Sequence, residues 1–159
     1  MTAPRNPALL ARFDGIAARL PLDVVLILAR LAIAATFWRS GQTKVSGLSV
    51  DLVEGRFEWG WPRLSDSAVA LFRDEYRLAV IPPEIAAPLA AAAEHVFPVL
   101  LLAGLATRLS AAALLAMTAV IQIFVYPDAW PLHATWAACL LALMKFGAGR
   151  VSLDRLIQT

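Results

Sequence analysis

Long apolar runs, separated by short polar segments, dominate the chain after its amino-terminal arm. A helix needs about 20 mostly apolar residues to cross a bilayer. Runs that approach this length cover residues 22–40, 85–106, 109–126 and 130–146. The pattern therefore predicts an all-α integral membrane protein, in which residues 1–159 form a single domain built as a four-helix bundle. Residues 41–84 then form one long loop outside the bilayer.

This outer loop has a hydrophobic pattern of its own. Trp59 and Trp61 stand close together, and tryptophan favours the headgroup level of a membrane. Further along, Phe72 and Tyr76 recur with the spacing of one helix face, which predicts an amphipathic helix lying on the outer surface. We expect these four aromatic side chains to form the surface on which a partner protein docks.

Composition supports a membrane protein. Hydrophobic residues make up 60% of the chain and charged residues only 16%. In soluble domains about half of the residues are hydrophobic and about a quarter are charged. The formal net charge of +2 is too small to indicate a nucleic-acid-binding surface. The lipid bilayer is thus the first expected partner.

The basic residues outside the apolar runs predict an orientation. Cytoplasmic ends of membrane helices carry an excess of lysine and arginine. The segments that would share one side of a four-span bundle carry Arg5, Arg12, Arg19, Arg108, Lys145, Arg150 and Arg155. Both termini are therefore expected in the cytoplasm. A signal peptide is the alternative interpretation of the first apolar run.

Two charged residues interrupt the apolar runs near mid-depth. Arg30 lies in the first run and Glu94 in the second. Charges at mid-membrane are costly, so they usually face protein and have partners. Counting along the two runs in opposite directions brings both residues to similar levels, which predicts a buried Arg30–Glu94 ion pair. The alternative to a functional pair is that it only fixes helix packing.

Other polar residues gather towards the outer end of the predicted bundle. Gln122 and Tyr126 follow each other at helical spacing, and His133 begins the last run at the same level. We expect a cavity there, lined by Arg30, Glu94, Gln122, Tyr126 and His133. His95 lies about 100° around the helix from Glu94 and has no assigned neighbour. It remains a candidate ligand-binding residue beside Gln122, Tyr126 and His133.

The sequence favours some cofactors over others. The single cysteine, Cys139, excludes an internal dithiol. His95 and His133 lie at different depths, which disfavours a bis-histidine haem, and no paired-ligand spacing indicates a metal site. No catalytic motif appears, so no catalytic residue is predicted. A quinone head group suits the candidate pocket best, because it needs only a few polar groups in an apolar site.

Several stretches together resemble the DoxX family of small membrane proteins. They are LARLAIAATFWRSGQTKV, the run from PPEIAAPLAA to IQIFVYPDAW, and GAGRVSLDRL. Positions that match the family pattern are Arg30, Gly41, Lys44, Glu94, Gly104, Thr107 and Arg108. The resemblance implies a four-helix bundle in a bacterial inner membrane, and it supplies no catalytic residue.

The resemblance also implies a class of function. Family members look like accessory membrane subunits, some of them similar to the membrane part of a thiosulfate:quinone oxidoreductase. The segments FRDEYRL and VYPDAW are most similar to a subgroup found with genes for metal-chelating peptides, which implies a role in copper or other metal stress.

Three functions of different classes follow. The first, which the sequence favours, is a non-catalytic accessory subunit that anchors a protein handling redox chemistry or metal stress; the other two are alternatives. The second is a quinone-binding membrane subunit of an oxidoreductase. The third is a small exporter component, for which a homodimer is expected because four helices make a narrow bundle.

Overall fold

The computed structural model describes residue 12 and residues 14–51, 55–78 and 81–157. Its elements run in the order α2 Leu22–Gln42, β1 Val45–Asp51, β2 Arg56–Leu64, α3 Asp66–Leu71, the π-helical turn η1 Phe72–Tyr76, α4 Pro83–Ala103, α5 Thr107–Val120, the π-helical turn η2 Ile121–Val125, the short 3-10 turn η3 Pro127–Ala129, α6 Trp130–Phe146 and α7 Leu153–Ile157. The all-α prediction is thus correct for the long elements, although the outer loop contains strands.

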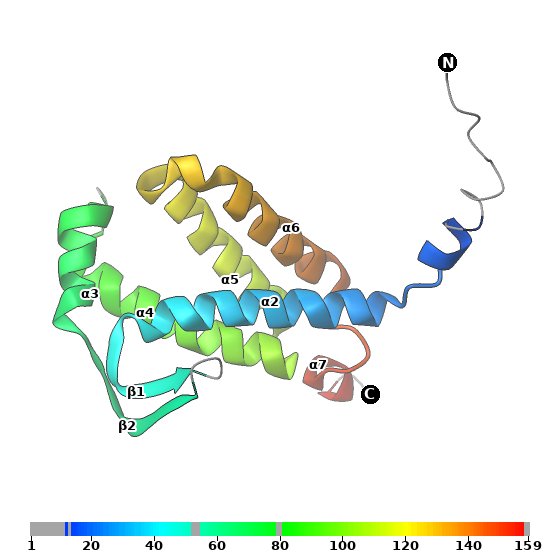
Figure 1. The fold of residues 1–159 in the computed structure, drawn as a ribbon, viewed down its shortest axis with the longest axis horizontal. Coiled ribbons are helices and arrows are strands. Elements are labelled where there is room, and N and C mark those ends of the chain that lie inside the picture. The colour runs from blue at the N-terminus through cyan, green and yellow to red at the C-terminus, as the bar shows by residue number, and fades with distance from the viewer. Residues whose placement is uncertain (1–11, 13, 52–54, 79–80, 158–159) are drawn as a thin grey trace, which may run out of the picture.

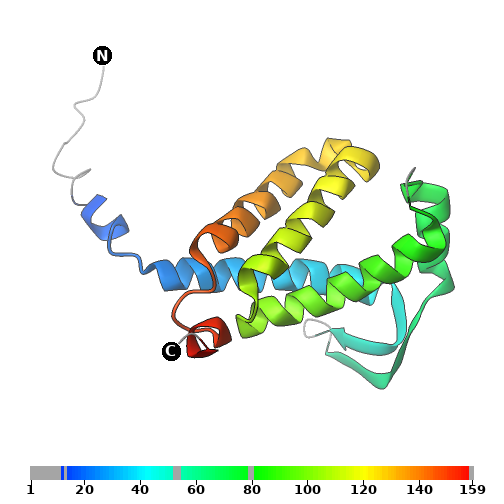
Figure 2. The same cartoon turned by 180° about the vertical axis from the view of Figure 1, so that it is seen from behind.

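The long helices pack as two antiparallel pairs. α2 lies along α4, and α5 lies along α6 (Figures 1 and 2). The pairs touch where α4 ends and α5 begins, and they diverge towards the end that carries α3 (Figure 1). We call the end near α7 the inner end and the opposite end the outer end.

A buried apolar cluster joins the two pairs. On α2, Leu26, Ile33 and Phe37 recur at spacings of seven and four residues, which places them on one helix face. They pack with residues of α4, α5 and α6 that include Leu101, Leu114, Leu140 and Leu143. This face holds the helices together, while other large apolar side chains, such as Leu28 and Leu31, are exposed.

Two helical segments are long and apolar enough to cross a membrane by length and composition, Pro83–Ala103 and Thr107–Val125. They correspond to the predicted runs 85–106 and 109–126. The first ends earlier than predicted because Gly104 adopts a left-handed conformation with φ of 65°. α2 carries Asp23, Arg30 and Arg39, and α6 has 17 residues, so the four-span prediction is supported directly for two helices.

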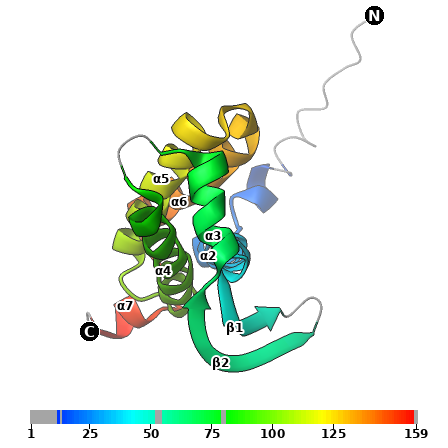
Figure 3. The same ribbon diagram turned by 90° about the vertical axis from the view of Figure 1, so that its left-hand side faces the viewer.

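The outer loop contains a β-hairpin that was not predicted. β1 and β2 pair antiparallel, with Leu48 opposite Trp59 and Val50 opposite Phe57 (Figure 3). At a bulge between Ser46 and Leu48, Gly47 has φ of 82°, and a side chain there would lie 2.6 Å from a β2 carbonyl oxygen. Alternation of aromatic residues every second position was the signal for a strand.

The predicted amphipathic helix is shorter than expected. α3 begins after Ser65, whose hydroxyl accepts a hydrogen bond from the amide of Ala68. The chain then continues as η1, and this helical segment ends at Arg77, which has a left-handed φ of 45°. Phe72 is buried against α4 residues Ala86 and Ala87, so this segment is anchored to the helices.

Candidate functional site

Arg30 fastens α2 to the inner end of the molecule. Its guanidinium Nε donates to the Leu101 carbonyl oxygen at 2.6 Å and Nη2 donates to that of Leu102, while Nη1 donates to the carbonyl oxygens of Ala148 at 3.1 Å and Val151 at 2.7 Å. The last carbonyls of a helix have no intrahelical partner. Arg30 therefore caps α4 and holds the segment that follows α6.

The turn between α4 and α5 is built around Asp154. Its carboxylate accepts hydrogen bonds from the amides of Ala106 at 2.7 Å and Thr107 at 2.9 Å. Burial by itself would raise the pKa of Asp154, but these hydrogen bonds and the nearby Arg30 charge hold it below the ordinary value. Gly104 fits beside this turn because a side chain there would lie 2.9 Å from the Arg30 guanidinium.

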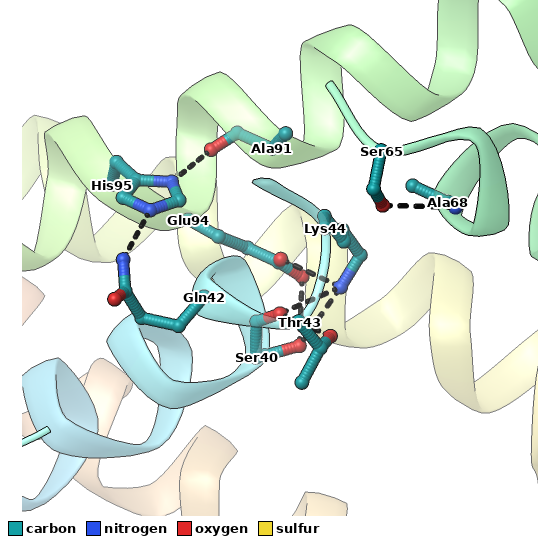
Figure 4. A network of polar contacts seen from close by, with 9 residues as sticks. All are labelled: Ser40, Gln42, Thr43, Lys44, Ser65, Ala68, Ala91, Glu94 and His95. Carbon is teal, nitrogen blue, oxygen red and sulfur yellow. Dashed lines mark hydrogen bonds and ion pairs between the residues drawn. The ribbon is translucent and has the colours of Figure 1, made fainter. Parts of the chain in front are cut away.

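Glu94 has a different partner from the one predicted. Its Oε2 lies 2.7 Å from the Lys44 ammonium, and both side chains are almost wholly buried (Figure 4). The Lys44 ammonium also donates to the Ser40 carbonyl oxygen at 3.2 Å and the Ser40 hydroxyl at 3.0 Å, which satisfies its three donors. Ser40 Oγ in turn donates to Glu94 Oε1 at 3.1 Å. The predicted Arg30–Glu94 ion pair is therefore wrong.

The error has a physical reason. Counting residues from the ends of two runs assumes that the helices are aligned end to end. In the structure Arg30 lies beside Leu101, whereas Glu94 lies beside Ser40. Lys44 comes 14 residues, or two heptads, after Arg30 and lies just beyond the end of α2. It therefore continues the helix face that carries Arg30. That spacing was the signal for the correct partner.

His95 lies against α2, outside the predicted cavity. Its Nδ1 is 2.7 Å from the Ala91 carbonyl oxygen and its Nε2 is 2.9 Å from Gln42 Nε2. Its ring packs edge-on to Trp38, with centroids 5.0 Å apart. A side chain at Gly41 would lie 2.8 Å from this imidazole, so Gly41 is needed for the close approach. His95 therefore fastens the helices, and its predicted place in the pocket is wrong.

A cavity of about 600 Å³ lies in the outer half, where the helix pairs diverge. Its walls are mostly apolar and come from α2, η1, α4, α5, η2 and α6. Polar side chains converge on it from several elements, namely Thr36, Ser40, Tyr76, Glu94, Tyr126 and His133. The structure thus brings three predicted residues, Glu94, Tyr126 and His133, to one cavity, while Arg30 lies elsewhere.

Gln122 does not line the cavity, but it orients His133, which does. The Gln122 amide nitrogen donates to the Pro127 carbonyl oxygen at 2.7 Å, so its Oε1 faces His133 Nδ1, also at 2.7 Å. An oxygen acceptor there requires a proton on Nδ1. In the neutral ring Nε2 then keeps its lone pair, and it has no hydrogen-bond partner among the residues that the structure describes.

Aromatic side chains close the outer mouth of the cavity. Tyr76 stands edge-on to both Phe72 and Tyr126, and the Tyr126 hydroxyl donates to Glu75. Burial raises the pKa of the Tyr76 hydroxyl above its ordinary value. Phe72 and Tyr76 were predicted to dock a partner, but they pack inward here. Of that predicted surface only Trp59 and Trp61, 79% and 83% exposed, face outward.

The remaining family-pattern residues, Thr107 and Arg108, lie at the start of α5. Thr107 is fully buried at the start of α5, and Arg108 Nη2 lies 3.4 Å from the Lys145 carbonyl oxygen. The family-pattern positions therefore form two groups. Arg30, Gly104, Thr107 and Arg108 organise the inner end, and Gly41, Lys44 and Glu94 lie towards the outer end.

Comparison with known proteins gives one match. A family model described as DoxX matches residues 25–127, which is more than half of the 159-residue chain. No curated protein and no solved structure matches the chain.

Proposed function

Because the chain belongs to the DoxX family, a family of membrane proteins, we propose that it is a membrane subunit that binds a quinone-type molecule in its outer cavity. The observation that carries the proposal is the convergence of Glu94, Tyr76, Tyr126 and His133 on one mostly apolar cavity. The subunit has an accessory role, and a redox partner supplies or accepts the electrons.

The cavity has the size and lining that such a ligand requires. Pockets for small organic molecules usually enclose about 300–1,000 Å³ and combine apolar walls with a few placed polar groups. The volume here is about 600 Å³. Phe37, Met117 and Trp136 offer flat or adaptable apolar surface for a ring. A quinone head group with its first isoprenoid unit fits these dimensions.

The polar groups favour the reduced, hydroxyl-bearing form of the ligand. His133 Nε2 offers a lone pair, and the Glu94 carboxylate lies on the same cavity wall. The Tyr126 hydroxyl already donates to Glu75, and the Ser40 hydroxyl already donates to Glu94. The Thr36 hydroxyl donates to the Ala32 carbonyl oxygen. That leaves the Tyr76 hydroxyl as the available donor against two acceptors, His133 and Glu94. A quinol, which donates through two hydroxyl groups, matches this set better than a quinone, which only accepts.

Surface chemistry supports placing all four long helices in the membrane. Charged and polar side chains such as Arg30, Lys44, Glu94, Thr118 and His133 are buried. Large apolar side chains face outward on every long helix, among them Leu28, Leu31, Leu89, Val96, Leu109, Ile123, Leu132 and Leu141. Such extensive apolar exposure is typical of a lipid-facing or partner-facing surface. We therefore propose a multi-pass inner-membrane protein with cytoplasmic termini.

A pair of neighbouring alanines provides the test. Ala93 lines the cavity, whereas Ala92 is exposed on the outside of the same helix. In detergent, a short-chain ubiquinol should raise the Tm of the wild-type protein and of Ala92→Phe, because a ligand that binds only the folded state stabilises it. Ala93→Phe fills the cavity and should abolish the shift. Equal shifts in both variants would rule out binding at this cavity.

The preference for the reduced form has its own measurement. Parallel titrations with short-chain ubiquinol and ubiquinone should give the lower Kd for the quinol. Each unmatched hydrogen bond at a buried polar group costs about 1–3 kcal/mol, so a difference of about fivefold or more is expected. Tighter binding of the quinone would contradict the assigned acceptor role of His133.

A second function, docking of a redox or metal-handling partner, is favoured by the hairpin. One face carries Leu48, Val50, Phe57 and Trp59, and the opposite face carries Ser49 and Glu58. Phe57 is 54% exposed and Trp59 79%. This amphipathic sheet stands outside the helices (Figure 3) and offers aromatic side chains of the kind that anchor protein interfaces.

Site-specific crosslinking separates docking from contact with lipid. A photoreactive residue replacing Trp59 should give one protein adduct of constant mass in membranes, and the same residue replacing Glu58 on the opposite face should not. A predominance of lipid adducts at position 59 would show that the hairpin lies on the bilayer and that it does not dock a protein.

A further inference from the structure

A second cavity, of about 580 Å³, lies at the inner end of the molecule. It is bounded by the start of α2, the start of α5, the end of α6 and the segment that leads into α7. This basic pocket is separate from the outer cavity, with which it shares no lining residue. Three arginines, Arg108, Arg150 and Arg155, line it, and all three are exposed.

The two carboxylates of the basic pocket already have partners. Asp154 accepts hydrogen bonds from two backbone amides at the start of α5. Asp23 accepts a hydrogen bond from the Arg150 amide at 2.7 Å, and its other oxygen lies 3.7 Å from Arg150 Nε. The Arg155 guanidinium has no partner among the described residues, and Arg108 makes only its long bond to the Lys145 carbonyl oxygen. The guanidinium groups of Arg108 and Arg155 therefore have N–H donors free to bind an anion.

The rim of the basic pocket is apolar. Leu22, Leu109 and Phe146 line it and are 49%, 68% and 48% exposed. All three lie at the inner ends of the long helices, where their exposed side chains continue the apolar exterior of the helix pairs. A ligand that fits has an anionic head to meet the arginines and hydrocarbon to lie against this surface. A free phosphate ion would leave the rim uncovered.

We propose that the basic pocket binds the phosphate-bearing headgroup of an anionic phospholipid, with the acyl chains running along the exposed faces of α5 and α6. Arg108 and Arg155 meet the phosphate oxygens, since arginine presents a planar fork of donors that matches them. Basic pockets between membrane helices on the cytoplasmic side are suited to such headgroups. The proposal does not depend on what the outer cavity binds.

The test uses the full-length protein in a mild detergent, with thermal unfolding as the readout. Phosphatidylglycerol should raise the Tm, whereas phosphatidylcholine and inorganic phosphate should not. Arg155→Gln should weaken the apparent affinity for phosphatidylglycerol about fivefold, the equivalent of about 1 kcal/mol per arginine near an anionic surface. Arg108→Gln combined with Arg155→Gln should weaken it further.

Arg63→Gln is the matched control, because Arg63 is exposed on β2 of the outer hairpin, away from the basic pocket. This variant removes the same charge and should respond to phosphatidylglycerol as the wild-type protein does. An equal response to phosphatidylcholine would overturn the proposal, as would equal stabilisation by inorganic phosphate. It would also be overturned if Arg155→Gln and the double variant bound phosphatidylglycerol with wild-type affinity.

Discussion

The Lys44–Glu94 pair is the most deeply buried charge arrangement among the described residues. Three hydrogen-bonding contacts saturate the ammonium, and one of the acceptors, Ser40, also donates to the carboxylate. A buried pair of this kind gives little net stability relative to apolar residues, but losing one member leaves the other charge without compensation. The pair therefore specifies how α2 and α4 meet.

Lys44→Met should lower the free energy of unfolding by about 3–5 kcal/mol, because Glu94 is left buried without a cation. Chemical denaturation in detergent micelles measures this change. The double variant Lys44→Met with Glu94→Leu should recover much of the loss, since neither charge then remains. Equal stability of wild type and Lys44→Met would contradict the assigned pairing.

Ala106 is one of two described residues other than glycine that have a positive φ, with a value of 48°. The left-handed conformation costs an L-residue about 1–2 kcal/mol. Ala106→Gly should therefore raise the stability by up to about 1 kcal/mol, after allowing for the greater freedom of glycine in the unfolded chain. Thermal unfolding provides the measurement. Ala92→Gly, at an exposed position in the middle of α4, is the control and should destabilise by about 1 kcal/mol.

At the scale of elements, α7 is attached to the helix pairs through Asp154. The carboxylate receives two amide hydrogen bonds, and the Asp154 amide donates to the Gly104 carbonyl oxygen at 2.8 Å. The α4–α5 turn and the carboxyl-terminal segment are therefore one structural unit, which the Asp154 carboxylate helps to hold together.

This unit should depend on pH. The pKa of Asp154 is lower in the folded state than the ordinary value of about 3.9, so its stabilising contribution is present above that value. The contribution is lost as the pH falls through the folded-state pKa. Limited proteolysis of the carboxyl-terminal segment between pH 6 and pH 3, taken as a range about the ordinary value, should show increasing cleavage at the acid end. Asp154→Asn should be cleaved more readily at neutral pH and show a weaker pH dependence.

The sequence predicted the long helices well and their contacts less well. The apolar run 130–146 coincides with α6, and the run 22–40 ends two residues before α2 does. Helix length follows from local composition, which the sequence states directly. The partner of Glu94 depends on the offset between two packed helices, which composition does not fix. The mistaken Arg30–Glu94 pair arose at that step.

The hairpin shows a second limit. Trp59 and Trp61 were interpreted as membrane-interface residues, although their alternation also indicates a strand. The hairpin depends on pairing between two consecutive strands and on Gly47 and Gly60 approaching closely at the bulge. The alternation in β2 was a local signal, but β1 has no comparable run of aromatic residues to mark it as the partner strand. Of the five residues predicted to line the outer cavity, Glu94, Tyr126 and His133 lie there, whereas Arg30 and Gln122 do not line it.

At the scale of the whole molecule, the two ends differ. Arg30 and Asp154 draw the helices, the α4–α5 turn and α7 together at the inner end. Towards the outer end the helix pairs diverge and leave the cavity, which Tyr76 and Tyr126 cover. Helix pairs that are joined at one end and diverge at the other leave room between them for an amphipathic ligand from the membrane.

The most direct test of this account is mass spectrometry of small molecules that co-purify with the protein from native membranes. Wild type and Ala92→Phe should each retain a quinone-type molecule close to one per chain, and Ala93→Phe, whose side chain fills the cavity, should retain none. Equal retention by all three proteins, or the absence of any such molecule from the wild type, would contradict the assignment of the outer cavity as its binding site.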